Sequence, residues 1–85
     1  MAIIVILEFQ DAIDGYDRAL ELMPELGDQP GRTSHVCAAT EQGFVVVEQW
    51  ASHDAYEHYV RLLDPVLTEC GLADRRQVLP VHYAM

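Results

Sequence analysis

The chain has 85 residues, 51% of them apolar, and sets 14 carboxylate side chains against five arginines, with no lysine and a formal net charge of −9. An excess of negative charge without a basic stripe repels phosphate backbones and anionic lipids, so we expect neither a nucleic-acid partner nor a membrane partner. The length predicts one domain over residues 1–85, and no apolar stretch approaches the ~20 residues that span a bilayer. Without a basic leader segment, a cytoplasmic location is the expectation.

Two runs of strand length, residues 2–7 and 44–47, are apolar at odd and even positions alike. A strand with this pattern buries side chains on both faces of its sheet. The helices of so short a chain can cover one face only, so the other face needs a cover from outside the chain, most simply a second copy. We therefore expect a homodimer.

The first half of the chain predicts a strand, a helix and a loop. The strand spans residues 2–9, and a one-sided helix follows, with Asp11 as its N-cap and Pro24 at its end. Its apolar positions recur at helical spacing: Ile13, Tyr16, Leu20 and Met23. Residues 24–32 hold two prolines and two glycines, a composition typical of a loop.

A hairpin is predicted next, from a strand over residues 33–40, a turn at 41–43 and a returning strand over 44–50. This hairpin brings the weaker, alanine-containing strand beside the strongly apolar one.

The last part predicts a second helix and a final strand. Ser52 is a good N-cap, Pro65 should kink or break the helix, and Gly71 is placed to end it. The final strand covers residues 75–83, where Pro80 favours an edge position.

The resulting order, strand, helix, strand, strand, helix, strand, is the split βαβ order of ferredoxin-like α+β folds. Right-handed crossovers place both helices on one face of a four-stranded antiparallel sheet, with the first and third strands in the centre. These are the two strands whose pattern already indicates burial on both faces.

The stretch from Gly43 to Tyr59 combines an apolar strand ending in Trp50, the N-cap Ser52 and an aromatic-rich helix. With the strand order, it resembles the dimeric α+β barrel superfamily, and within it the small antibiotic-biosynthesis-monooxygenase-like domains. The resemblance implies that two sheets pack face to face as an α+β barrel, with a ligand in each subunit between sheet and helices.

That resemblance implies a cofactor-independent monooxygenase or cyclase that acts on an aromatic or polyketide-like small molecule. Haem-degrading relatives use an Asn on the first strand, and this sequence contains no Asn, so that branch is not favoured. The alternative is a non-enzymatic homodimer, either a small-ligand-binding protein or a structural one.

Five residues are candidates for the site. Tyr59 is predicted to face inward from the second helix, where a phenol can donate a proton or else only pack in the core. His35 and His82 lie on predicted strands and are candidate general bases, with a structural hydrogen-bonding role as the alternative. Trp50 and Tyr56 are candidates for binding a flat ligand, or for packing. We expect no cofactor and no metal, because the histidines lack metal-ligand spacing.

Glu8 and Glu48 each interrupt an apolar strand. If both turned toward the helices they would form a buried carboxylate pair with raised pKa values, whereas solvation at the strand ends is the simpler interpretation. Cys37 and Cys70 lack the spacing of a redox or zinc motif and are predicted to be reduced structural thiols.

Overall fold

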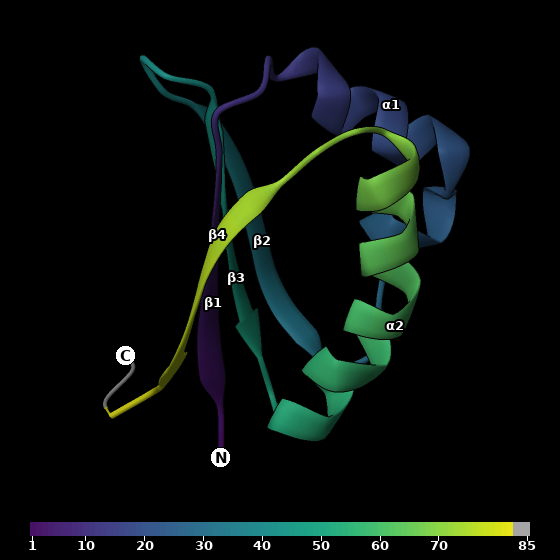
Figure 1. Ribbon diagram of the computed structural model, residues 1–85. Helices are drawn as coiled ribbons and strands as arrows, with labels where there is room; N and C mark the ends of the chain where they lie inside the picture. The colour runs from purple at the N-terminus through teal and green to yellow at the C-terminus, as the bar shows by residue number, and fades with distance from the viewer. Residues whose placement is uncertain (83–85) are drawn as a thin grey trace.

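A computed structural model describes residues 1–82 of the chain. One antiparallel sheet has the strand order β2-β3-β1-β4, formed by β1 (Ile3–Phe9), β2 (Arg32–Ala39), β3 (Phe44–Trp50) and β4 (Asp74–Pro80). The helices of this described part all lie on one face of the sheet (Figure 1). The predicted ferredoxin-like α+β fold is therefore confirmed, with β1 and β3 in the centre.

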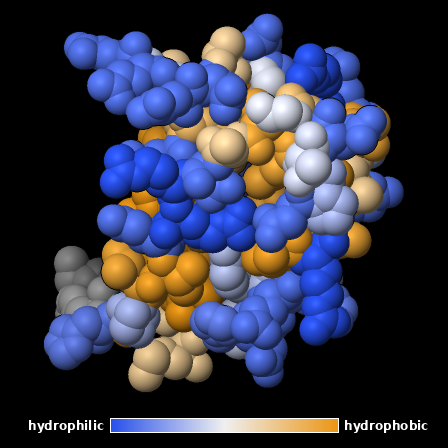
Figure 2. All heavy atoms as spheres, in the orientation of Figure 1, coloured by the Kyte–Doolittle hydropathy of each residue, from blue (hydrophilic) through white to orange (hydrophobic). Residues whose placement is uncertain are grey.

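The central strands alternate between a covered face and an open one. On the covered face each residue is at most 5% exposed: Ile3, Val5, Leu7 and Phe9 of β1, and Phe44, Val46, Glu48 and Trp50 of β3. The residues between them point to the open face, where Ile6 pairs with Val47, which is 36% exposed. Apolar side chains also reach the surface over the lower half of β4 (Figure 2).

Helix α1 (Asp14–Leu22) begins later than the sequence indicated. Asp11 is not its N-cap; Ile13 holds that position, without a side-chain cap, and is 40% exposed. Packing sets this start, because Gly15 lies so close to Leu72 that a Cβ at residue 15 would be 2.8 Å from a Leu72 methyl carbon.

The segment predicted as a loop over residues 24–32 contains a short 3₁₀ helix, η1 (Pro24–Gly27). Pro24 occupies its first turn, where a missing N–H is tolerated because it would have no helical partner. Its one fully buried side chain, Leu26, joins the core.

Helix α2 (His53–Glu69) begins as predicted, since the Ser52 hydroxyl accepts a hydrogen bond from the Ala55 amide at 3.1 Å. Pro65 does not break it; this proline lies on the exposed side of the helix, where water can reach the carbonyl group that loses its partner. Gly71, at φ 68°, ends the helix as predicted, and the Leu72 amide donates to the Leu67 carbonyl at 2.8 Å. Within residues 1–82, no helix is long and apolar enough to cross a bilayer.

Strand β4 is an edge strand, as Pro80 indicated, and it ends at that residue. The prediction extended this strand to residue 83, which lies outside the described residues. Beyond Pro80, the Val81 amide donates to the Ala2 carbonyl at 2.9 Å.

Arg76 links β4 to α2. Its guanidinium donates to Asp64 at 3.0 Å, to Asp74 at 2.9 and 3.0 Å, and to the Tyr56 hydroxyl at 3.3 Å. The hydrogen bonds of Asp74, ahead of those of Asp64, raise the pKa of Arg76.

We expect Arg76→Met to lower the free energy of unfolding by about 1–2 kcal/mol, because the charged hydrogen bonds are lost while the apolar stem is kept. Arg61→Met, at an exposed position of α2, is the matched control and should change little. Chemical denaturation of both variants measures the difference, and equal losses would contradict a linking role.

Candidate functional site

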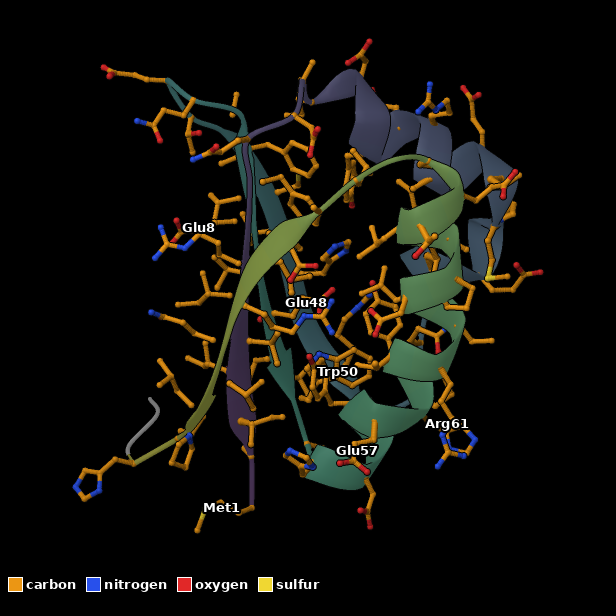
Figure 3. The ribbon with its side chains drawn as sticks, viewed as in Figure 1. Met1, Glu8, Glu48, Trp50, Glu57 and Arg61 are labelled. Atoms are coloured by element: carbon orange, nitrogen blue, oxygen red, sulfur yellow. The ribbon has the colours of Figure 1, made fainter. Side chains whose placement is uncertain are left out.

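The carboxylate of Glu48 is fully buried between the sheet and the helices. Figure 3 shows Glu48 and Trp50 pointing from β3 toward the helices, and Glu8 pointing away from them. The two carboxylates therefore form no pair. Solvation was the correct interpretation for Glu8, which is exposed, and the wrong one for Glu48.

Two donors hold the Glu48 carboxylate. The indole Nε1 of Trp50 donates to Oε1 at 3.1 Å, and Nη1 of Arg32 donates to Oε2 at 3.3 Å. The Arg32 side chain is only 5% exposed; it also donates to the Leu26 carbonyl at 3.0 Å, and its guanidinium lies 5.5 Å from the ring centre of Tyr59. A buried charge is thus paired, hydrogen-bonded and covered by an aromatic ring.

Burial raises the pKa of Glu48, and hydrogen bonds from Trp50, the charge of Arg32 and the Tyr59 hydroxyl partly offset that rise. Because the guanidinium of Arg32 is always charged and has little access to water, the carboxylate is its counter-ion. Burial, and after it the neighbouring Glu48, raises the pKa of the Tyr59 phenol. Tyr59 therefore stays protonated.

His35, on β2, stands between this ion pair and helix α1. Its Nε2 lies 3.2 Å from the Tyr16 hydroxyl and 3.6 Å from Oε2 of Glu48. Burial, and after it the charge of Arg32, lowers the pKa of His35, so the imidazole is neutral at pH 7. A neutral imidazole whose Nε2 lies near both a hydroxyl and a carboxylate oxygen is equipped to accept a proton.

A small cavity of about 30 Å³ adjoins these groups. Its walls are apolar side chains of the sheet and both helices, including Leu7, Leu63 and Leu67, and its polar groups belong to Tyr16, His35 and Tyr59. A volume of this size holds one or two water molecules. The arrangement brings acid–base groups to the wall of an otherwise apolar space.

Among residues 1–82 no group of three or more side chains is arranged to hold a metal ion. Cys37 and Cys70 are free thiols, and burial raises the pKa of Cys37.

No protein-family model and no curated protein matches this chain. Solved structures do match. Rv0793 from Mycobacterium tuberculosis is 18% identical with a TM-score of 0.75, and the match covers both chains completely. SnoaB from Streptomyces nogalater, a cofactor-independent oxygenase, is 13% identical with a TM-score of 0.67, covering 99% of this chain and 94% of its own. A Chloroflexus aurantiacus protein provisionally named antibiotic biosynthesis monooxygenase is 16% identical, with a TM-score of 0.68 and coverage of 100% and 98%.

The fold is antibiotic-biosynthesis-monooxygenase-like. This confirms the fold of the single chain that the resemblance implied. Because identity is below 20% in each case, the similarity establishes the fold, and the chemistry must be argued from this chain's own residues.

In this monooxygenase-like fold the five candidate residues do not all meet. His35 and Tyr59 line the cavity between sheet and helices. Trp50 lies beside it and donates to Glu48, whereas the Tyr56 hydroxyl accepts a hydrogen bond from Arg76. His82 lies beyond the end of β4 and is exposed.

Tyr16 and Arg32, at the centre of the cluster, were not among the candidates, and Glu48 was considered only as one of a possible carboxylate pair with Glu8. Tyr16 was recognised only as part of the apolar stripe of the first helix, and Arg32 fell within the predicted loop. Glu48 did carry a usable signal, because strict alternation places it on the same face as Val46 and Trp50.

His35 should make the stability of this domain depend on pH. In the unfolded chain His35 has a pKa of about 6.5. In the folded chain this pKa is lower, so between the two pKa values the unfolded state binds more protons than the folded state. We expect the free energy of unfolding to fall as the pH drops from about 7 to about 5.5, and His35→Gln to make that fall shallower. Denaturant titrations at the two pH values test this, and identical slopes in both proteins would contradict it.

Proposed function

We propose that this chain binds a small aromatic or polyketide-like molecule between its sheet and its helices, and acts on it as a cofactor-independent monooxygenase or cyclase. The observation that carries the proposal is the neutral imidazole of His35 at the wall of an apolar cavity, beside the phenols of Tyr16 and Tyr59. The similar fold of SnoaB, a cofactor-independent oxygenase, supports a monooxygenase function.

His35 is proposed as the general base. It removes a proton from a phenol or enol of the ligand, and an electron-rich anion remains in the apolar cavity. In a monooxygenase reaction this anion is the reductant: a CH₂ group becomes C=O, one atom of O₂ enters the product and the other leaves as water. In a cyclase reaction the anion attacks a carbonyl carbon of the same molecule.

A ligand with an aromatic ring needs more than 30 Å³, so it must displace side chains. Leu20 of α1 is only partly buried against the core and is the side chain proposed to move outward. The small volume also favours the second candidate function, a structural homodimer whose cavity binds nothing larger than water.

A second copy of the chain is proposed to cover the open face of the sheet. Val36 and Leu79 are 59% and 46% exposed there, far more than apolar side chains of a finished core. The charged strand residues on this face, Glu8 and Arg75, oppose each other in the register and cancel, although the chain as a whole carries −9. Two such faces can therefore meet without repulsion.

Turnover tests the proposal. Protein freed of metals is incubated with a panel of phenols, naphthols, hydroxylated tricyclic aromatics and open-chain aromatic polyketones, under O₂ and under N₂, and products are identified by mass spectrometry. A monooxygenase gives an O₂-dependent product that has gained an oxygen atom and lost two hydrogens. A cyclase works under both gases, and a structural dimer yields no product.

Once a substrate is found, His35→Gln should reduce kcat/KM by about 10²–10⁴-fold, the usual contribution of a general base. His53→Gln is the matched control, because His53 is exposed on α2 and pairs with Glu57 at 3.2 Å away from the cavity. Equal rates in the wild type and His35→Gln would remove His35 from the mechanism.

A further inference from the structure

We propose that Tyr16, His35 and Glu48 form a proton relay in which Tyr16 meets the ligand, His35 receives the proton and the buried Glu48 stabilises the resulting imidazolium. This proposal rests on the proposed function and assigns roles to two residues beyond the general base. The three side chains come from α1, β2 and β3, so the relay exists only in the folded chain.

The geometry places one nitrogen between two oxygens. His35 Nε2 is 3.2 Å from the Tyr16 hydroxyl, a hydrogen-bond distance, and 3.6 Å from Glu48 Oε2, a distance that suits an ion pair once the imidazole is charged. Nε2 can therefore accept the proton of Tyr16 along this hydrogen bond, and the resulting imidazolium charge lies within ion-pair distance of the carboxylate.

Tyr16, and not Tyr59, has the hydroxyl suited to meet a ligand. The Tyr59 ring is 4% exposed, lies 5.0 Å from the Trp50 ring, and its hydroxyl faces Glu48. Tyr16 is only partly buried, and its ring meets Phe44 edge to face at the cavity wall. A ligand entering beside α1 reaches Tyr16 first.

Glu48 supplies a charge that packing alone does not require. Replacing a buried ion pair by apolar residues of similar size is often neutral or stabilising, so the Arg32–Glu48 pair suggests a role other than stability. With Trp50 on Oε1 and Arg32 on Oε2, the carboxylate is fixed in position, and His35 faces Oε2.

The transfer balances without any redox partner. The ligand O–H bond breaks and its proton goes to the Tyr16 oxygen, while the Tyr16 O–H proton forms a new N–H bond on His35 Nε2. The ligand anion stays in the cavity, and the imidazolium faces the Glu48 carboxylate. The reverse sequence returns the proton to the product.

Titratable and charged groups from four elements surround His35 and influence its protonation state. Tyr16 of α1 and Tyr59 of α2 are neutral phenols, Arg32 of β2 opposes protonation, and Glu48 of β3 favours it. Burial, and after it the charge of Arg32, keeps the imidazole neutral until a proton arrives through Tyr16.

Nitrogen NMR of the full chain with ¹⁵N-labelled histidine tests the relay without a substrate. In the wild type we expect the neutral His35 ring to carry its hydrogen on Nδ1, with Nε2 accepting from Tyr16. Tyr16→Phe should shift the Nε2 resonance, and Glu48→Gln should lower the pKa of His35, because it removes a carboxylate 3.6 Å from Nε2. His53 reports in the same spectra as an internal control, and its resonances should be the same in all three proteins.

A hydrogen on Nε2 in the neutral ring, or a pKa of His35 unchanged by Glu48→Gln, would overturn the relay. If Glu48→Gln does not fold, the wild-type tautomer and the Tyr16→Phe spectrum still decide the matter. Since this measurement involves no turnover, the relay can fail while the proposed enzymatic function stands, and the two failures remain distinguishable.

Discussion

Glu48→Ala is expected to lower the free energy of unfolding by about 3–5 kcal/mol, the largest stability effect in this chain. The substitution leaves the Arg32 guanidinium, whose side chain is 5% exposed, without its counter-ion, and it removes the acceptor of the buried Trp50 N–H. In a domain of this size such a loss is a large share of the total stability. Guanidinium denaturation, followed by the fluorescence of the single tryptophan, measures it.

The double variant Arg32→Met with Glu48→Leu is the informative control. It removes both charges and fills the space with apolar atoms, so most of the lost stability should return, less the unsatisfied Trp50 N–H. A loss below about 1 kcal/mol for Glu48→Ala alone would show that the carboxylate is not held as described.

Val47→Lys is expected to abolish the proposed dimer. Val47 lies in the centre of the open sheet face, opposite Ile6 on β1 and Val36 on β2. Two copies meeting on this face would bury two like charges in an apolar contact, which costs several kcal/mol. Sedimentation velocity over a wide dilution series measures the mass in solution.

Leu62→Lys provides the matched control for this experiment. Leu62 is 38% exposed, close to the 36% of Val47, but it lies on α2, on the helical side of the molecule. This variant should remain a dimer. A wild-type protein that is monomeric throughout would contradict the dimer, and a Leu62→Lys variant that dissociates while Val47→Lys does not would place the interface on the helical side.

The fold was accessible from the sequence because its local signals agree with one another. The runs at residues 2–7 and 44–47 indicated strands buried on two faces, and these became the central strands β1 and β3. Ser52 and Gly71 marked the ends of α2 correctly, because each satisfies backbone groups through its own chemistry. The start of α1 was wrong because tertiary packing at Gly15, which a sequence does not display, determines it.

The site was less accessible, for physical reasons that differ between its residues. An irregularity between Arg32 and Ser34 shifts the register of β2, and Arg32 pairs with Trp50 on the covered face although it lies at the end of a predicted loop. A lone Glu in a strand is usually solvated. Glu48 can be buried because Arg32, its partner, is buried beside it. Tyr16 was interpreted as a core residue because its spacing fits an apolar stripe. The hydrogen bond between its hydroxyl and His35 joins residues 19 positions apart, which local sequence patterns do not reveal.

Methyl NMR with a bound phenol tests most directly whether the cavity between sheet and helices receives the ligand. A naphthol is titrated into protein with labelled Leu, Val and Ile methyl groups. We expect the cavity methyls of Leu63 and Leu67 to shift together with the His35 ring, while Ile6 and Val47 of the open face stay unchanged. Shifts confined to Ile6 and Val47, or no shift with any phenol of the panel, would contradict a ligand site in this cavity.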